Sequence, residues 1–230
     1  MLTLEAVRKV YRKKQDEVVA LDTTSLEIAR GDFIAIIGPS GSGKTTLLSM
    51  LGAMSAPSEG RILLDGESIY DLPVNLRAEV RQNKIGFVFQ TFNLIPYLTA
   101  IENVQIPMVL AKKHRGEQQE KAEALLSKVG LQDRLQHKPA ELSVGQQQRV
   151  ALARMLANDP SIILADEPTG NLDPDTKDQV MEYLTQFNEE GRTIIMVTHD
   201  LSAANCARKT LTLSEGTICD IPQSQLLKTA

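Results

Sequence analysis

The chain has 230 residues, 42% of them hydrophobic, which is enough to bury the core of one large domain or of a domain with an inserted subdomain. Its formal net charge is −4, whereas proteins that bind nucleic acid are usually basic, so the composition argues against a nucleic-acid partner. Aromatic residues make up only 4% of the chain and Trp is absent, which also argues against stacking on single-stranded bases.

Neither a membrane span nor a secretory signal is expected. No segment reaches the apolar length that a bilayer-spanning helix needs, and the residues from Met1 to Glu5 are polar and strand-like. Any role at a membrane would therefore come through a partner. The two cysteines, Cys206 and Cys219, form no CxxC pair and favour a reducing compartment over a disulfide framework.

The first elements along the chain are short strands that lead to a glycine-rich loop. Residues 18–21 and 25–29 are strand candidates, and residues 30–32 are the turn that follows them. The apolar run at residues 33–37 is short and β-branched, as expected of a buried parallel strand. Residues 45–51 then have the pattern of a helix.

The loop between this last strand and the helix carries the strongest motif of the sequence. Residues 38–45 read Gly-Pro-Ser-Gly-Ser-Gly-Lys-Thr and match the pattern G-x-x-x-x-G-K-[ST]. The glycines let backbone N–H groups turn toward a phosphate, and the helix dipole adds positive potential. We expect Lys44 to reach the β- and γ-phosphates and Thr45 to bind Mg²⁺. The flanking strand and helix disfavour the alternative, a Gly- and Ser-rich loop that binds nothing.

The chain returns to strands before a long helical stretch. Residues 60–66 read as a strand that ends in an Asp-Gly turn, and residues 85–89 read as a short apolar strand. Gln90 follows directly, in a position where a glutamine can touch Mg²⁺ and the attacking water or simply belong to a loop. From about residue 92 to residue 158 the pattern is helical, with one helix ending at Gly130, and this stretch is interpreted as an insertion.

A second helix start inside the insertion is also suited to a phosphate. Ser143 is the predicted N-cap, Gly145 follows it, and residues 150–157 continue as a well-packed helix. A serine and a glycine at a helix N-terminus offer a hydroxyl and free backbone N–H groups to an anion.

Two acids and one histidine follow later strands. Residues 162–165 form an apolar strand that ends in Asp166 and Glu167. Because ligands of parallel sheets bind at the carboxyl ends of the strands, we expect both acids beside the glycine-rich loop. Asp166 is assigned to Mg²⁺ and Glu167 to the attacking water; the alternative is an ordinary surface pair of acids.

The remaining elements complete an α/β pattern. A helix presents Val180, Leu184 and Phe187 on one face together with Tyr183, and residues 193–197 are predicted to be the last buried strand. His199 follows that strand and would donate to the γ-phosphate, whereas His114 and His137 lie in polar sequence. Short apolar strands alternating with amphipathic helices predict a mainly parallel sheet covered on both faces.

In the order of these motifs the sequence resembles the ATP-binding-cassette (ABC) ATPase family, over nearly the whole chain. The segments that match the family are the Walker A loop at Gly38–Thr46, the Q-loop at Gln90, the signature motif at Leu142–Gln146, the Walker B strand at Ile162–Glu167, the D-loop at Asn171–Asp173 and the switch histidine at His199. Tyr11 stands where the family has an aromatic ring that stacks on adenine.

The resemblance implies a P-loop NTPase of ABC type, with a mainly parallel core, an antiparallel β subdomain and an inserted helical subdomain. Residues 1–230 would form one ATPase domain, with residues 1–91 and 159–230 as the core and residues 92–158 as the helical subdomain. The implied activity is ATP hydrolysis with Mg²⁺, carried by Lys44, Gln90, Glu167 and His199. The implied ATP ligands are Tyr11, Gly38, Ser40, Gly41, Ser42, Gly43, Lys44, Thr45, Thr46, Ser143, Gly145, Gln146 and Asp173, and the implied metal ligands are Thr45, Gln90 and Asp166.

The family arrangement further implies a head-to-tail homodimer that sandwiches two ATP molecules, each between the Walker A loop of one chain and the signature of the other. An isolated monomer would then hydrolyse ATP poorly. One departure is visible, because Val144 stands where the family usually has the first glycine of Leu-Ser-Gly-Gly-Gln. Valine is stiff and bulky, so we expect a competent site with an altered fit around the phosphate.

Transport-type members of the family imply an integral-membrane permease as partner, and a location on the cytoplasmic face of the membrane. We expect a groove that receives a cytoplasmic helix of the permease to be lined by Thr91, Phe92, Leu94, Ile95, Leu98 and Ile101. The run Asp-Glu-Pro-Thr-Gly-Asn-Leu-Asp at residues 166–173 resembles the branch that serves lipoprotein release, macrolide export and the cell-division permease.

Two other functions compete with this one. A soluble ABC protein of translation or DNA repair would usually have tandem cassettes or long coiled-coil insertions, neither of which the sequence shows. A P-loop kinase or GTPase would lack the signature segment, and a guanine-reading Asn-Lys-x-Asp motif is not apparent here.

Overall fold

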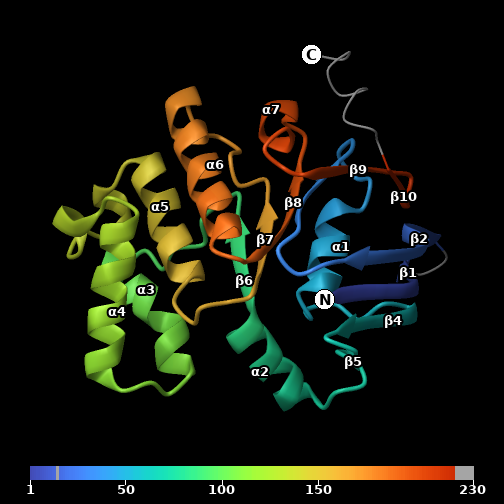
Figure 1. The fold of residues 1–230 in the computed structure, drawn as a ribbon, viewed down its shortest axis with the longest axis horizontal. Helices are drawn as coiled ribbons and strands as arrows, with labels where there is room; N and C mark the ends of the chain where they lie inside the picture. The colour runs from blue at the N-terminus through green and yellow to red at the C-terminus, as the bar shows by residue number, and fades with distance from the viewer. Residues whose placement is uncertain (14–15, 221–230) are drawn as a thin grey trace.

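The computed structural model describes residues 1–13 and 16–220, which form two sheets and a set of helices (Figure 1). The antiparallel sheet has the order β2-β1-β4-β5, and its strands are Leu2–Lys13 (β1), Asp16–Ile28 (β2), Glu59–Leu64 (β4) and Glu67–Ser68 (β5). The central sheet has the order β10-β9-β3-β8-β7-β6, and its strands are Phe33–Ile37 (β3), Ile85–Phe89 (β6), Ile162–Asp166 (β7), Thr193–Thr198 (β8), Lys209–Ser214 (β9) and Thr217–Asp220 (β10). The α-helices are Lys44–Leu51 (α1), Val74–Lys84 (α2), Ala100–Leu110 (α3), Arg115–Lys128 (α4), Val144–Met155 (α5), Pro174–Glu189 (α6) and Leu201–Ala204 (α7).

The central sheet is parallel from β6 to β9, and only β10 pairs antiparallel, so the prediction of a mainly parallel sheet is confirmed. Alternation along β3 divides the core into two layers. Ile34 and Ile36 pack on the side of α1 and the antiparallel sheet, whereas Phe33 and Ala35 pack on the side of α3 to α7. Both faces are therefore buried, and the carboxyl ends of the strands form the open edge.

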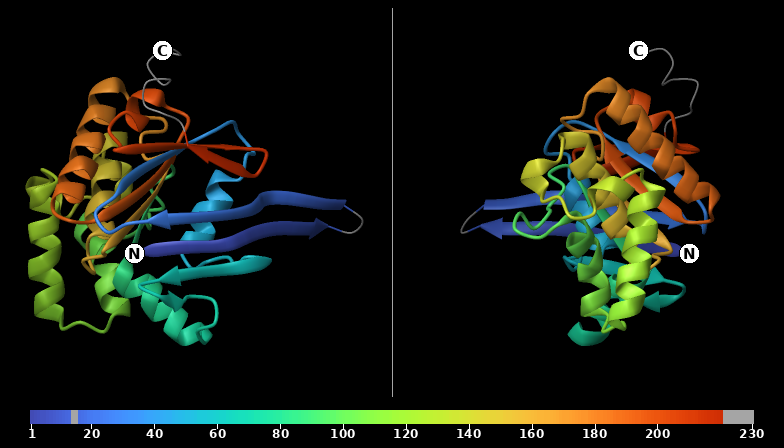
Figure 2. Two further views of the ribbon diagram at one scale, coloured as in Figure 1. Left: turned by 45° about the vertical axis from the view of Figure 1, so that its right-hand side comes forward. Right: turned by 90° about the vertical axis from the view of Figure 1, so that its left-hand side faces the viewer.

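The antiparallel sheet forms the other body of the fold. Figure 2 shows β1 and β2 as a long hairpin that extends away from helices α3 to α6. The sequence predicts two separate strands, at residues 18–21 and 25–29. This separation is wrong, because β2 is one continuous strand from Asp16 to Ile28. Its pairing with β1 shifts register near Val7 and Lys9, as at a β-bulge. The two strands remain paired on both sides of these shifts.

Helices α3, α4 and α5 occupy the stretch that the sequence assigns to the insertion, and they pack against one another. The helix predicted to end near Gly130 is α4, and Gly130 has the left-handed φ of 69° expected of a helix-terminating glycine. The predicted boundaries of the helical subdomain, at residues 92 and 158, stay a prediction. Residues 221–230 of the predicted core lie outside the described part of the structure.

Two parts of the fold differ from the sequence-based expectation. The strand at residues 193–197 is not the last buried strand, because β9 follows it and buries Leu211 and Leu213 beside β3. Helix α2 was not predicted, since none of its residues is fully buried and it has no apolar stripe to reveal it. Across the described residues, the helices are all too short or too polar to cross a membrane.

Candidate functional site

The glycine-rich loop is held between two strands by close backbone contacts. A Cβ atom on Gly43 would lie 2.0 Å from the carbonyl oxygen of Ala20 in β2, and one on Gly38 would lie 2.1 Å from that of Leu213 in β9. Gly43 also has a φ of 103°, which only glycine adopts readily. Both glycines are therefore required for the loop to seat between the two sheets.

Gly43→Ala is expected to destabilise the fold by well over the ~1–2 kcal/mol that left-handed backbone alone costs a non-glycine residue, because its methyl group would meet the Ala20 carbonyl. Gly41→Ala is the matched control: Gly41 has a φ of 80°, but a Cβ atom there meets nothing within 4 Å. Thermal denaturation of both variants checks this expectation. Equal melting temperatures would contradict the proposed contact between the loop and β2.

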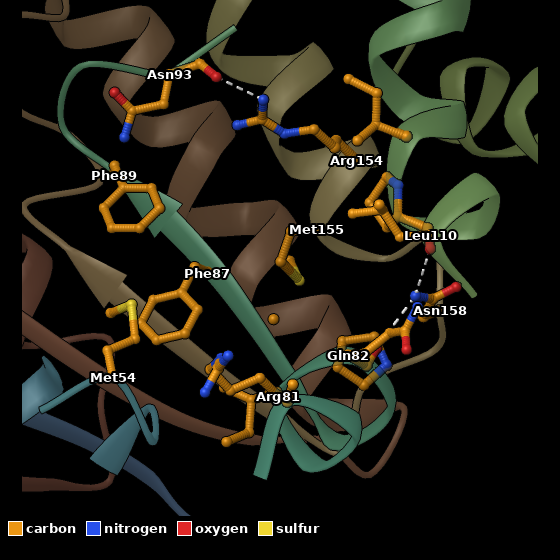
Figure 3. Close-up of a pocket in the computed structure, with 16 residues that line it drawn as sticks. Met54, Arg81, Gln82, Phe87, Phe89, Asn93, Leu110, Arg154, Met155 and Asn158 are labelled. Carbon is orange, nitrogen blue, oxygen red and sulfur yellow. Dashed lines mark hydrogen bonds between the residues drawn. The ribbon is translucent and has the colours of Figure 1, made fainter. Parts of the chain in front are cut away.

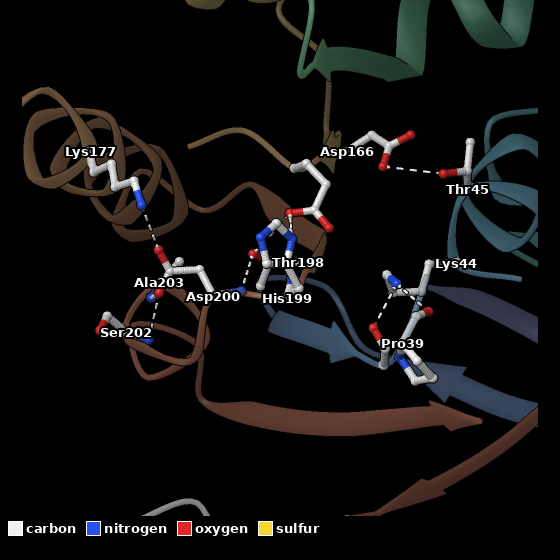
Figure 4. Close-up of polar contacts among 12 residues, drawn as sticks. Pro39, Lys44, Thr45, Asp166, Lys177, Thr198, His199, Asp200, Ser202 and Ala203 are labelled. Atoms are coloured by element: carbon white, nitrogen blue, oxygen red, sulfur yellow. Dashed lines mark hydrogen bonds and ion pairs between the residues drawn. The ribbon is translucent and has the colours of Figure 1, made fainter. Parts of the chain in front are cut away.

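Helix α1 begins without a side-chain cap at Gly43, so its first backbone N–H groups are left for another acceptor. The hydroxyl of Ser42 is also buried and has no hydrogen-bond partner among the described residues. Lys44 Nζ donates to the carbonyl oxygens of Gly38 (2.8 Å) and Pro39 (2.9 Å), which fixes the ammonium over the loop (Figure 4). Free donors and a fixed positive charge together make a site for an anion such as phosphate.

Asp166 lies across the site from α1, at the end of β7. The hydroxyl of Thr45 donates to Asp166 Oδ1 at 3.4 Å (Figure 4). Burial raises the pKa of the Asp166 carboxyl, and the neighbouring Glu167 adds to the rise, while Thr45 and Lys44 oppose it. A cation placed beside this partly buried carboxylate would relieve that cost, and two of the three predicted metal ligands, Thr45 and Asp166, lie together.

Glu167 and His199 meet at the same edge of the sheet, directly after β7 and β8. His199 Nδ1 lies 2.9 Å from Glu167 Oε2, and the buried hydroxyl of Thr198 donates to the same oxygen at 3.3 Å. Glu167 has a left-handed φ of 48°, an uncommon conformation for glutamate that is often found at functional sites. The exposed imidazole and the mostly buried carboxylate are thus in direct contact, as their positions after β7 and β8 predict.

Gln90 joins this pair around a small pocket of about 120 Å³ whose lining includes Gln90, Glu167 and His199. Its amide lies over Gly170, where a Cβ atom would come within 2.7 Å of Gln90 Nε2. The structure therefore places Gln90, Glu167 and His199 next to one another.

The signature segment starts helix α5 with a complete capping box. Ser143 Oγ accepts from the backbone N–H of Gln146, and the Gln146 side chain accepts from the backbone N–H of Ser143. The predicted N-cap is confirmed. Val144 occupies the first helical position with its side chain 49% exposed, so a valine is compatible with the helical backbone there.

The signature segment also touches the start of α6. A Cβ atom on Gly145 would lie 2.7 Å from the Thr176 methyl group, so the two helix starts approach closely. Asp173 caps α6 by accepting from the Thr176 N–H and hydroxyl, which lowers the pKa of the Asp173 carboxyl. Its predicted contact with ATP stays a prediction.

The predicted ligands of the signature segment lie apart from the phosphate loop within the chain. Figure 1 shows α1 and α5 on opposite sides of the central strands, so Ser143, Gly145 and Gln146 belong to a second location. Tyr11 is an exposed ring on β1, with the Lys9 ammonium 5.0 Å from its centroid. Its predicted role at adenine stays untested.

Sequence reasoning missed side chains that bind backbone carbonyl groups. The fully buried Gln148 in α5 donates to the carbonyl oxygen of Pro168, immediately after Glu167, at 2.6 Å. Arg154 in the same helix donates to the carbonyl oxygens of Phe92 and Asn93. A backbone acceptor leaves no signal in the sequence, so these links require the folded chain.

A hollow of about 660 Å³ lies between α2, β6, α3 and α5 (Figure 3). Most of its lining is apolar, and its main members are Met54, Ile85, Phe87, Phe89, Ile106, Leu110, Met155 and Pro160. We call this hollow the α2–α5 groove. The residues predicted to line a permease groove do not line this hollow, and that role stays a prediction: Thr91, Phe92, Leu94, Ile95, Leu98 and Ile101.

Local packing keeps some of these residues away from the hollow. Ile101 is 3% exposed and belongs to the core, and Phe92 and Leu94 pack against that core. The fully buried Asn103 side chain forms hydrogen bonds with the backbone of Ile95 and Leu98. These bonds hold residues 95–99 against the start of α3. Phe92, Leu94 and Ile101 are therefore held at the core, whereas Tyr97 is 73% exposed.

The chain is similar to known proteins over most of its length. A family model described as ABC transporter matches residues 21–170. The uncharacterized ABC transporter ATP-binding protein YknY of Bacillus subtilis is 44% identical over 225 residues, which cover 98% of each chain. The macrolide export ATP-binding/permease protein MacB of Syntrophobacter fumaroxidans is 47% identical over 221 residues, and these cover 95% of this chain but only 31% of MacB.

A solved structure also matches. The ATP-binding cassette MJ0796 of Methanocaldococcus jannaschii, in a dimeric post-hydrolysis state bound to ADP and Pi, superposes with a TM-score of 0.88 at 41% identity. The match covers 96% of this chain and 99% of the other. The chain thus spans about a third of the MacB relative and nearly all of the single-cassette relatives.

Proposed function

The chain belongs to the ABC transporter family, as an ATP-binding protein related to MacB and YknY, and on this premise we propose that it hydrolyses ATP as a dimer to drive a membrane permease. The observation that carries the proposal is the meeting of the phosphate loop, Asp166, Glu167 and His199 at the carboxyl edge of one parallel sheet. The substrate is ATP and the products are ADP and phosphate, the pair that the MJ0796 structure contains.

The residues around Thr45 fit a Mg²⁺ ion delivered with the nucleotide. Mg²⁺ is usually bound by one or two protein oxygens together with substrate phosphates. Thr45 and Asp166 supply such oxygens, whereas the described residues contain no cluster of three or more His, Cys, Asp or Glu side chains that would hold a metal alone. We infer that Thr45 and Asp166 hold it, with Gln90 as the third ligand. When bound, Mg²⁺ would offset negative charge on the β- and γ-phosphates.

The chain's own residues would bind the phosphates and orient the attacking water through their positions and charges. Lys44 and the uncapped start of α1 bind the phosphates of ATP and stabilise charge that develops in the transition state. Glu167 accepts a proton from the attacking water, and Thr198 and His199 hold its carboxylate in place. His199 is exposed enough to turn toward the γ-phosphate of ATP once the nucleotide is bound.

The separate location of the signature segment supports dimerisation around ATP. Ser143, Gly145 and Gln146 lie on the far side of the central strands from their own phosphate loop, so they are free to complete the site of a second chain (Figure 1). Two MJ0796 structures are described as dimeric. A dimer of this kind accounts for two phosphate-suited helix starts in one chain.

The α2–α5 groove supports a permease as the partner. It is mostly apolar, and Leu110 at its rim is 69% exposed, which suits the apolar face of a short helix (Figure 3). The MacB relatives are described as ATP-binding/permease proteins, and the match with this chain covers 31% and 35% of their length. We therefore place the protein at the cytoplasmic face of the membrane, bound to a permease of the macrolide-export, lipoprotein-release or cell-division type.

The test is purification of the tagged chain from detergent-solubilised native membranes, followed by mass spectrometry. A stoichiometric integral-membrane protein would establish the permease and name the branch. Recovery of soluble proteins alone would leave a soluble ABC ATPase and overturn the membrane role.

Leu110→Asp is expected to abolish co-purification of the permease and to leave the ATPase activity of the isolated chain within about twofold, because a charge in the groove opposes burial of the partner helix. Val18→Asp on the distant hairpin is the control, since Val18 is also exposed but lies away from the groove. Retention of the permease by the Leu110 variant would show that the groove is not its docking site.

A further inference from the structure

Arg154 makes an unusual pair of bonds beside the α2–α5 groove. Its Nη1 atom donates to the carbonyl oxygen of Asn93 at 2.6 Å (Figure 3). Its Nη2 atom donates to the carbonyl oxygen of Phe92, also at 2.6 Å. Phe92 and Asn93 are consecutive and both left-handed, with φ values of 57° and 49°. Left-handed backbone is a true outlier for a bulky residue such as phenylalanine, so something must hold this segment.

The chemistry of Arg154 suits that task. Its planar guanidinium presents two parallel donors, which a lysine cannot do. Among the described residues it forms no ion pair, so backbone carbonyl groups are the partners of its charge. Burial lowers the pKa of the Arg154 guanidinium, which indicates a partly dry environment where these bonds are strong.

The segment that Arg154 holds begins at Gln90. Gln90 follows β6, lies over Gly170 and lines the small pocket with Glu167 and His199. Arg154 itself is near the end of α5, whose first turn carries Ser143. One guanidinium thus links the helix of the signature segment to the loop that positions Gln90.

We propose that Arg154 is a positioning residue for ATP hydrolysis: it holds Phe92 and Asn93 in their left-handed conformation, so that α5 and Gln90 shift as one unit. The proposal rests on the proposed function, because it assigns Gln90 to the hydrolytic site. Asn93 and Arg154 also line the α2–α5 groove, so an occupant of the groove would reach the hydrolytic site through this link.

Arg154→Lys in the full chain is expected to lower kcat about tenfold, the size of one lost hydrogen bond from a charged donor, and to leave KM for ATP within about twofold. We expect kcat to fall while KM stays unchanged, because the phosphate loop binds ATP without Arg154. Arg149→Lys is the matched control: Arg149 is on the same helix and donates to the carbonyl oxygen of Val129, away from Gln90. Its kcat is expected to stay within about twofold of the wild type.

A double-mutant cycle separates positioning from general destabilisation. In a Gln90→Ala background, Arg154→Lys is expected to change kcat by less than about twofold, since the residue through which it acts is gone. Melting temperatures of all variants are measured alongside. If Arg154→Lys does not fold, Arg154→Gln takes its place, because it keeps one donor without a buried charge.

Equal losses of kcat in the Arg154 and Arg149 variants, or a tenfold loss that persists in the Gln90→Ala background, would overturn the positioning role. Such a result would leave hydrolysis by the wild-type chain intact. Failure of the proposed function would instead appear as a wild-type chain that does not hydrolyse ATP at any concentration.

Discussion

Glu167→Gln is expected to bind ATP as tightly as the wild type and to lose about 10²–10⁴-fold in kcat, because glutamine keeps the shape of the side chain but cannot accept the proton of the attacking water. The substitution also replaces the carboxylate that meets His199 and Thr198 with a neutral amide. ATP would then persist between two chains, so the variant is expected to accumulate as a dimer when ATP is added. Steady-state phosphate release and light scattering after size exclusion measure the two effects.

Glu189→Gln is the matched control, since Glu189 is an exposed carboxylate near the end of α6, away from the hydrolytic pocket. Its kcat is expected to equal that of the wild type. Normal hydrolysis by the Glu167 variant would remove Glu167 from the mechanism, and a dimer that forms without ATP would separate assembly from nucleotide binding.

Lys44→Ala is expected to weaken ATP binding by roughly 10–100-fold, since a hydrogen bond from a charged donor contributes about 1.5–3 kcal/mol. Lys44 is the cation that the structure fixes over the phosphate loop, through the carbonyl oxygens of Gly38 and Pro39. Titration of a fluorescent ATP analogue measures the change directly. Hydrolysis at saturating ATP is also expected to fall, because the same charge stabilises the transition state.

Lys121→Ala, at a half-buried position of α4, controls for the general loss of one positive charge. It is expected to bind the analogue as the wild type does. Unchanged binding by the Lys44 variant would contradict the phosphate-loop role, whatever the effect on hydrolysis.

The parts of the fold that could be predicted from the sequence are those with a local signal. The strand before the glycine-rich loop is a continuous apolar run, and β3 is buried on both faces as that run predicts. Ser143 and Gln146 have the spacing of a capping box, and they form one. Asp166 ends a strand and Glu167 and His199 directly follow strands, so the rule for parallel sheets brings them to one edge.

The parts that could not be predicted depend on contacts between distant segments. Strand β9 alternates Thr and Leu over only six residues, and its place beside β3 is visible only in the folded sheet. The burial of Ile101 and the bonds from Asn103 to the backbone of Ile95 could not be read from the apolar pattern of this segment. Arg154 and Gln148 bind carbonyl groups, which every residue carries and which therefore leave no trace in the sequence.

The contact between Gly43 and Ala20 also makes position 43 much less tolerant of substitution than position 20. Position 43 is limited to one residue type, since any Cβ atom there meets the carbonyl oxygen of Ala20. Position 20 contributes only its main chain to that contact, so the identity of its side chain is unconstrained by the loop. Libraries of variants should therefore retain glycine alone at position 43 while accepting many strand-forming residues at position 20.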